Sequence, residues 1–233
     1  MEETVRDRLA RVLDRVARAA ARSGRSAGSI RLVAVSKMHP VERVAEAYEA
    51  GVRVFGENYV QEAEEKVRAF PGAEWHLIGK LQANKVKKAV SLFGWVQAVD
   101  SPRLLADLSR RSIEVGRTLP VLIEVNLAGE GSKAGIPPEG LQALLSSASA
   151  LPGVRVRGLM AIPPMTEDPE ESRPYFARLR ELLVRCASHG GAAVEMTELS
   201  MGMSSDFEAA IEEGATMVRI GTAIFGSRAR RAG

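Results

Sequence analysis

Lys37 follows an apolar run, residues 32–35, that has the composition of a buried strand. A lysine at the end of a strand is usually a solvated charge. An amine that is buried or lies beside other cations loses its proton more readily, however, and can then form Schiff bases. Arg219 lies in a second strand-like run, "TMVRIG", and would supply such a cation. The pair indicates Schiff-base chemistry if the fold brings both residues to one place.

Two glycine-bearing segments are suited to holding an anion. Residues 198–211, "ELSMGMSSDFEAAI", read as a strand, a glycine turn and a helix whose start offers Ser204, Ser205 and Asp206. Residues 218–228, "VRIGTAIFGSR", read as a strand, a Gly-Thr turn and a short helix. Unpaired N–H groups at a helix start point at an anion, and glycine lets the backbone approach it. We expect a phosphate site here; the alternative is that the glycines only make tight turns.

The elements that must position these residues alternate along the chain. Eight short apolar runs typical of strands covered on both faces end near Lys37, Asn58, Gly79, Asp100, Asn126, Ile162, Met201 and Gly221. Helical patterns separate them, with no linker or break in composition. We therefore predict an α/β fold in which residues 1–233 form a single (β/α)8 TIM barrel. A doubly wound open sheet is the alternative, but no G-x-G-x-x-G follows the first strand.

An additional helix, from residue 5 to about residue 20, precedes the first strand. Its apolar residues recur at helical spacing on one face: Val5, Leu9, Val12, Leu13 and Val16. We interpret it as a helix that packs on the outside of the barrel. A helix that binds a membrane surface or a partner is the alternative.

In a barrel of this kind the functional residues lie at the C-terminal ends of the strands. Those ends carry Lys37, Glu57, Asn58, His76, Asp100, Asn126, Met160, Ser200, Arg219, Gly221 and Thr222. An amine, a phosphate cradle and an arginine that can face a pyridine nitrogen together suggest pyridoxal 5'-phosphate as a cofactor.

Composition excludes several other classes of protein. Hydrophobic residues make up 45% and charged residues 26% of the 233, as in ordinary soluble proteins. No apolar run approaches the roughly 20 residues of a membrane helix, and no signal sequence is evident. The single cysteine, Cys186, excludes an internal disulfide and is expected to be a buried thiol. His39, His76 and His189 have no metal-ligand spacing. We expect a cytoplasmic protein without a metal or a membrane partner.

The net charge of +3 is too small to indicate a nucleic-acid partner. Basic residues cluster in residues 79–90 and in the tail 227–233, but aromatic residues for base stacking are only 5% of the chain. We interpret Lys80, Lys85 and Lys88 as part of a solvated face, together with Lys87. RNA binding is kept as a further hypothesis, which predicts that the binding affinity falls steeply as the salt concentration rises.

At these positions the sequence resembles the pyridoxal phosphate homeostasis proteins, whose barrel is of the alanine racemase N-terminal-domain type. The segments that match, between residues 32 and 226, are "LVAVSK", "FGENYVQE", "WHLIGKLQANK", "LIEVNLAGEGSKAG", "GLMAI", "LSMGMSSDFEAAI" and "VRIGTAIFG". The resemblance implies that Lys37 holds the cofactor as an internal aldimine and that Arg219 approaches the pyridine nitrogen. It also implies phosphate contacts from Ser200, Gly221 and Thr222, with Asn58 and His76 lining the same pocket.

The resemblance further implies a role in vitamin B6 homeostasis without an established reaction. Racemases of this type use a second domain to bring an acid/base tyrosine to the cofactor. The sequence ends at Gly233, shortly after the eighth unit, so we expect no such domain and a monomer. We predict a carrier or regulator rather than an enzyme, with apo-enzymes that need the cofactor as partners. The alternative is a racemase or transaminase of low activity that uses Lys37 as base. Lys133 is a candidate for a second proton handler or transfer lysine in that case, but we interpret it as an exposed loop lysine.

Overall fold

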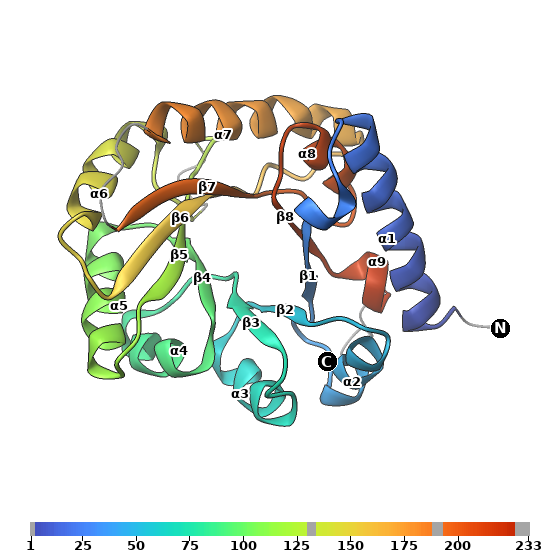
Figure 1. Cartoon of the computed structure of the whole chain (residues 1–233), viewed down its shortest axis with the longest axis horizontal. Coiled ribbons are helices and arrows are strands. Elements are labelled where there is room, and N and C mark those ends of the chain that lie inside the picture. Colours follow the sequence, from blue (N-terminus) through green and yellow to red (C-terminus); the bar gives the residue numbers. More distant parts are fainter. Residues whose placement is uncertain (1–2, 130–133, 188–192, 227–233) are drawn as a thin grey trace.

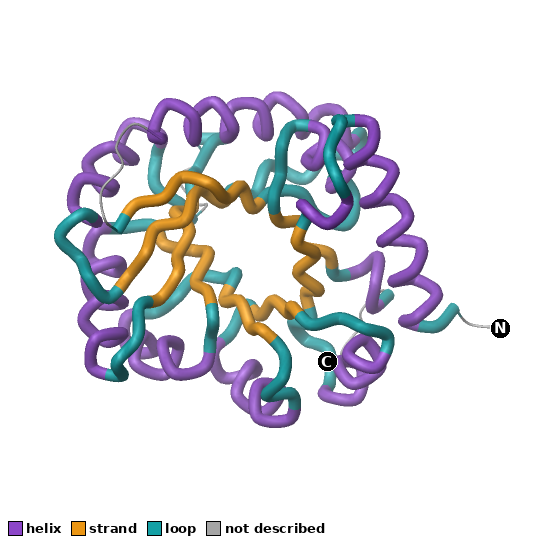
Figure 2. The backbone as a smooth tube through the Cα atoms, viewed as in Figure 1, coloured by secondary structure: helices purple, strands orange, loops and turns teal. Residues whose placement is uncertain are grey.

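The computed structural model describes residues 3–129, 134–187 and 193–226. Within these ranges the strands run parallel in chain order, and β1 pairs with β8, which closes the sheet into a barrel (Figures 1 and 2). The strands are β1 Arg31–Val35, β2 Val54–Glu57, β3 Glu74–Leu77, β4 Trp95–Val99, β5 Leu119–Glu124, β6 Val154–Met160, β7 Val194–Ser200 and β8 Met217–Ile220. The predicted (β/α)8 barrel is confirmed, and the open sheet is wrong.

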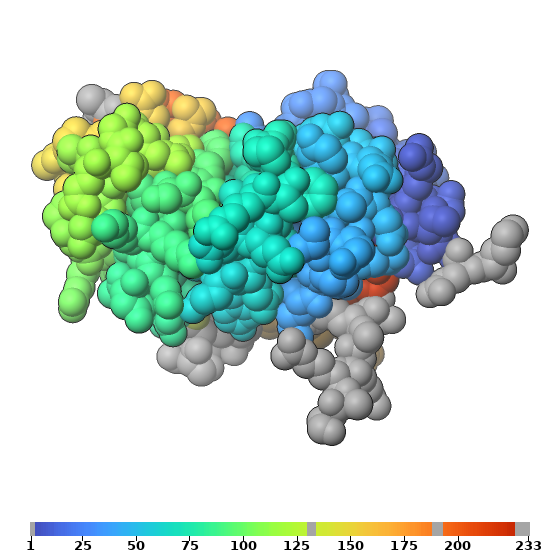
Figure 3. All heavy atoms as spheres, turned by 90° about the horizontal axis from the view of Figure 1, so that it is seen from below, coloured from blue at the N-terminus to red at the C-terminus, as the bar shows by residue number. Residues whose placement is uncertain are grey.

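Helices cover the outside of the barrel. The α-helices are α1 Val5–Arg22, α2 Val41–Glu49, α3 Val60–Ala69, α4 Val86–Leu92, α5 Pro102–Glu114, α6 Leu141–Ala148, α7 Arg173–Cys186, α8 Phe207–Glu212 and α9 Thr222–Phe225. Short 3-10 turns are η1 Ala27–Ser29, η2 Ala83–Lys85, η3 Pro138–Gly140 and η4 Pro169–Ser172. In the face that Figure 3 shows, neighbouring parts of the surface follow the chain in order, from blue through teal and green to yellow.

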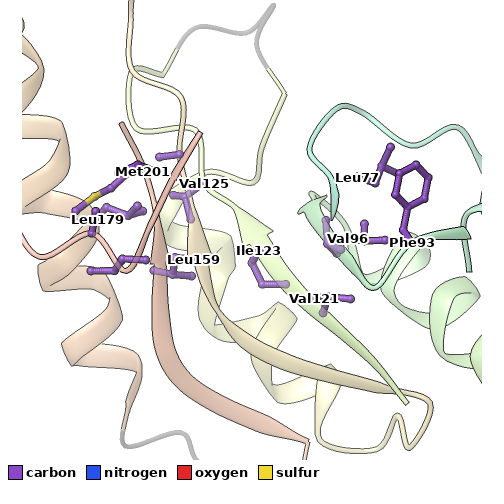
Figure 4. Close-up of a cluster of buried hydrophobic side chains, with 14 of the residues drawn as sticks. Leu77, Phe93, Val96, Val121, Ile123, Val125, Leu159, Leu179 and Met201 are labelled. Carbon is purple, nitrogen blue, oxygen red and sulfur yellow. The ribbon is translucent and has the colours of Figure 1, made fainter. Parts of the chain in front are cut away.

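Most strands are mainly apolar on both faces because each face meets a different hydrophobic layer. Successive side chains of a strand point to opposite faces. Val121 and Ile123 of β5 therefore belong to the layer between the barrel and its helices, which Figure 4 shows with Leu159 and Leu179. Leu122, between them, belongs to a smaller cluster with Trp95, Ala98, Met160 and Met217. The strands thus pack between two hydrophobic layers, and polar residues lie at their C-terminal ends.

Helix α1 lies outside the barrel, near the place where β8 pairs with β1. It packs against α8 and α9 and begins at a capping box formed by Thr4 and Asp7. Ion pairs join Arg15 to Glu208 at 2.9 Å and Arg22 to Glu212 at 2.6 Å. The predicted apolar face is buried at Val5, Leu9, Val12 and Val16. The expectation for Leu13 is wrong, because this side chain is 48% exposed.

Cys186 is buried at the end of α7, as expected for a structural thiol. Across the described residues, no helix combines the length and the apolar character that crossing a membrane requires.

Candidate functional site

A cavity of about 450 Å³ opens at the C-terminal ends of the strands. Its lining comes mainly from the segments that follow β1, β2, β6, β7 and β8: Val35, Lys37, Asn58, Ile78, Ile162, Met165, Thr166, Met203, Ser204, Ser205, Asp206, Arg219, Gly221 and Thr222. Five of the seven predicted site residues, Lys37, Asn58, Arg219, Gly221 and Thr222, are in this set. The other two, His76 and Ser200, are not.

Lys37 reaches the cavity from a tight turn directly after β1. The Ser36 N–H still bonds to the Gly56 carbonyl of β2 at 3.0 Å, and the His39 N–H returns to the Ser36 carbonyl at 3.1 Å. The turn therefore starts at the barrel rim and leaves the half-buried Lys37 on the cavity wall.

Asn58 lies beside Lys37 on the next strand end, and its position depends on a glycine. A Cβ atom at Gly79 would lie 2.6 Å from the Asn58 carbonyl oxygen and 2.8 Å from its Cα. Such contacts are closer than a side chain tolerates. Gly79 thus lets the segment after β3 pass close behind Asn58, which stays on the cavity wall.

Arg219 brings a buried guanidinium to the cavity from β8. Its NH1 donates to the Ser200 hydroxyl at 2.6 Å, and its NH2 donates to the Ala161 carbonyl at 2.9 Å. The residue is only 4% exposed. Burial lowers the pKa of Arg219 to about 10, against the opposing charges of Glu124 and Asp206. The group is therefore cationic at neutral pH and fixed in direction by two hydrogen bonds.

Ser200 and His76 belong to a polar chain inside the barrel. The Ser200 hydroxyl donates to Gln97 Oε1 at 2.6 Å, and Gln97 Nε2 lies 2.6 Å from His76 Nδ1. Because the amide nitrogen can only donate, His76 Nδ1 accepts, and its Nε2 donates to Glu74 at 2.5 Å. Burial lowers the pKa of His76, in agreement with this neutral form. Both residues are fully buried, and this chain of hydrogen bonds connects them to Arg219.

The loops after β7 and β8 meet at a cluster of amide and hydroxyl groups. Ser204 Oγ accepts hydrogen bonds from the N–H groups of Gly221 at 3.3 Å and Ala223 at 3.2 Å. Asp206 Oδ1 accepts from the Met203 N–H at 2.7 Å and holds the preceding turn. Ser204 and Ser205, rather than Ser200, are serines of the cavity wall. The chain continues past β7 through the Gly202 turn, so the residues after the glycine, not the strand's last residue, reach the rim.

The other strand ends contribute less to this cavity. Asn126 Oδ1 accepts from the Gly129 N–H at 3.1 Å, Met160 is buried, and Asp100 does not line the cavity. The sequence pattern missed Glu124, the last residue of β5, which is 6% exposed. Burial raises the pKa of Glu124 to about 7, with Arg219 opposing. The sequence could have indicated Glu124, because it is the one charged residue in the apolar run "PVLIEVN".

Among the residues that the structure describes, the remaining candidates form no second site. Among the described residues no group of His, Cys, Asp and Glu is arranged to hold a metal ion. His39 stacks on Phe225, with ring centroids 4.9 Å apart. Lys88 of the basic face forms an ion pair with Glu64. Lys133, His189 and the basic tail lie outside the described residues. RNA binding stays a hypothesis.

Known proteins share the fold of this chain. The family described as "Alanine racemase, N-terminal domain" matches residues 8–229. Alanine racemase from Corynebacterium glutamicum, 19% identical, has the same fold with a TM-score of 0.66 over 91% of this chain and 60% of its own. The chain therefore belongs to the class of proteins built on the barrel of the alanine racemase N-terminal domain.

Closer relatives define the family. The pyridoxal phosphate homeostasis proteins of Aquifex aeolicus and Escherichia coli K12 are 46% and 44% identical, covering 95% and 94% of this chain and 97% and 95% of their own. The structure of PipY from Synechococcus elongatus with pyridoxal phosphate bound is 41% identical, with a TM-score of 0.84 over 96% of this chain and 100% of its own. This chain belongs to the pyridoxal phosphate homeostasis protein family.

Proposed function

We propose that this protein binds pyridoxal 5'-phosphate in the cavity and acts in vitamin B6 homeostasis as a carrier or regulator. The observation that carries the proposal is that Lys37, Arg219 and the Gly221 loop line one cavity. The homeostasis name of its relatives and the cofactor in PipY support it.

The groups around the cavity suit the parts of this cofactor. In the structure the N–H groups of Gly221 and Ala223 donate to Ser204 Oγ. We assign these two N–H groups, with the hydroxyls of Ser204 and Thr222 on the cavity wall, to a bound phosphate. Lys37 supplies a primary amine. When bound, the cofactor supplies an aldehyde carbon that condenses with a primary amine and releases water. We assign Lys37 to that bond, Asn58 to contact with the cofactor, and His76 and Ser200 to support of Arg219.

The electrostatics of Arg219 favour a carrier over an enzyme. A guanidinium with a pKa of about 10 keeps its protons at neutral pH and can only donate. Facing a pyridine nitrogen, it would leave that nitrogen unprotonated, which weakens the ring as a sink for carbanion charge. We infer that the protein stores the reactive aldehyde and delivers it, as a monomer, to apo-enzymes that need it.

The test is the visible absorption spectrum of the purified protein with pyridoxal 5'-phosphate, before and after borohydride reduction. We expect an absorption band that collapses on reduction, with the mass of the reduced cofactor mapped to Lys37. Lys37→Ala should abolish both. Lys80→Ala is the matched control, because Lys80 is an exposed lysine at the same rim and does not line the cavity. An adduct spread over several lysines would contradict the assignment.

A turnover assay separates the carrier from the racemase or transaminase alternative. Small amino acids are incubated with the loaded protein, and D-amino acid and keto acid are measured. We expect no turnover above that of free cofactor. Turnover that Lys37→Ala abolishes would contradict a pure carrier.

A further inference from the structure

Helix α3 binds both peptide groups that flank Lys37. The Lys66 ammonium donates to the Ser36 carbonyl, in the peptide group before Lys37, at 2.8 Å. The Met38 N–H, in the peptide group after Lys37, donates to Glu62 Oε2 at 3.2 Å. Glu62 and Lys66 lie four residues apart, so they are neighbours on one helix face. Two successive turns of α3 therefore hold the backbone of Lys37 from both sides.

A buried ion pair anchors this arrangement to the barrel wall. Glu57 Oε1 accepts hydrogen bonds from the Lys66 ammonium and from the Ser36 hydroxyl, both at 2.7 Å. Glu57 is fully buried and Lys66 is 4% exposed. Within the described residues, the second carboxylate oxygen of Glu57 has no hydrogen-bond partner. Burial raises the pKa of Glu57 against the opposing charge of Lys66.

The backbone of the turn is also strained. Met38 has a φ of 61° and is, in the described part of the chain, the one residue other than glycine with a positive φ. Glycine usually occupies such a position in a turn because a side chain is unfavourable there. Strain of this kind persists only where surrounding contacts impose it, and the Glu62 contact with the Met38 N–H is one of them.

Stability alone does not account for these features. A buried ion pair stabilises a fold poorly, because removing two charges from water offsets most of their attraction. Alternation along β1 and β2 places Ser36 and Glu57 toward α3, while Lys37 and Asn58 line the cavity. The ion pair thus lies directly behind the cavity wall, in contact with the residue before Lys37.

We propose that Glu57, Lys66 and Glu62 are positioning residues that hold the Lys37 turn and so aim its amine into the cavity. The inference rests on the proposed function, because it concerns the amine that would condense with the cofactor aldehyde. A misplacement of about 1 Å in a reacting group slows a reaction by roughly 100-fold, so a loosened turn should be measurable.

The experiment compares covalent with non-covalent binding. Stopped-flow absorbance measures the rate of adduct formation with pyridoxal 5'-phosphate, and calorimetry measures the affinity for pyridoxine 5'-phosphate, which lacks the aldehyde. The double variant Glu57→Leu/Lys66→Met replaces the ion pair with apolar groups, a change that usually preserves folding. Glu62→Ala removes the second contact from an exposed position, and Glu65→Ala, an exposed neighbour on α3, is the matched control.

We expect adduct formation to slow at least about 10-fold in the double variant and in Glu62→Ala, with unchanged affinity for pyridoxine 5'-phosphate. Glu65→Ala should match the wild type. If the double variant does not fold, the rate of adduct formation in Glu62→Ala tests the positioning role. Two results would overturn the positioning role and leave the proposed function standing. One is adduct formation at the wild-type rate in the folded variants. The other is a loss of affinity for pyridoxine 5'-phosphate as large as the loss in the rate of adduct formation. A wild-type protein that forms no adduct would overturn the proposed function as well.

Discussion

Arg219 donates to the Ser200 hydroxyl at 2.6 Å, and this bond is the first of a chain of hydrogen bonds in which every donor points the same way. Ser200 donates to Gln97, Gln97 to His76, and His76 to Glu74. Glu74 begins β3, so the chain runs through the barrel from the cavity to the opposite end. A cation at one end and a carboxylate at the other polarise each bond in the same sense.

Gln97→Leu should destabilise the protein through this chain. The substitution leaves the Ser200 donor and the His76 acceptor without partners in a buried place, which costs about 2–4 kcal/mol. Urea unfolding measures the loss. Glu74→Gln is the control, because its amide oxygen still accepts from His76, and we expect a change under about 1 kcal/mol. A Gln97→Leu protein as stable as the wild type would show that the chain does not support Arg219.

Arg219→Lys should weaken binding of the cofactor ring and leave binding of phosphate alone. A lysine keeps the charge but cannot reproduce the directed bonds to Ser200 and Ala161. We expect the affinity for pyridoxine 5'-phosphate to fall about 10-fold, the effect of one charge-assisted hydrogen bond. Calorimetry with inorganic phosphate serves as the comparison. Equal losses for both ligands would place Arg219 at the phosphate instead.

Ser204→Ala should reduce phosphate binding more than Ser205→Ala. Both serines line the cavity, but Ser204 bonds to the Gly221 and Ala223 N–H groups, whereas Ser205 is exposed. Loss of the Ser204 hydroxyl should lower the affinity for pyridoxine 5'-phosphate about 10-fold, and Ser205→Ala should lower it about twofold or less. Calorimetry on the two variants checks this. The reverse order would show that the amide cluster is not the anion site.

Glu124 should make the stability of the protein fall between about pH 4.5 and pH 7. Its pKa is about 7 in the folded protein and 4.5 in its ordinary state, because burial outweighs the attraction of Arg219 and Lys80, while Asp100 adds repulsion. The folded state therefore binds the proton more tightly, and its stability falls by up to about 3 kcal/mol as the pH rises through this window.

Urea unfolding at pH 5 and pH 8 measures the effect. Glu124→Gln should remove this part of the fall, because glutamine does not titrate. Glu139→Gln, at an exposed position on η3, should keep the wild-type pH dependence. If Glu124→Gln and the wild type respond alike to pH, Glu124 does not carry this proton.

The local pattern of the sequence was enough to predict the barrel and the residues at its rim. Short, mainly apolar runs broken by helical segments mark all eight strands, because most of the residues in these strands are buried by the helices on one side or by the barrel interior on the other. The same pattern predicts that Lys37, Asn58 and Gly221 lie on one rim, since parallel strands end on the same side. Arg219 reaches this rim as well, from inside β8.

The roles of individual polar residues depended on the tertiary structure. Ser200 ends its strand as predicted, yet Gln97 and Arg219 occupy its hydroxyl, and Ser204 takes its place on the cavity wall. Glu57, which ends β2 beside Asn58, faces α3 instead of the cavity.

The physical reason is the range of the interactions involved. Hydrophobic periodicity is a local property that decides where a strand runs and where it ends. A hydrogen bond between Gln97 and Ser200 joins positions 103 residues apart, and only the closed barrel brings them together. The sequence by itself therefore determined the scaffold and the amine on its rim. The partners that orient Lys37 and Arg219 were decided by the three-dimensional packing.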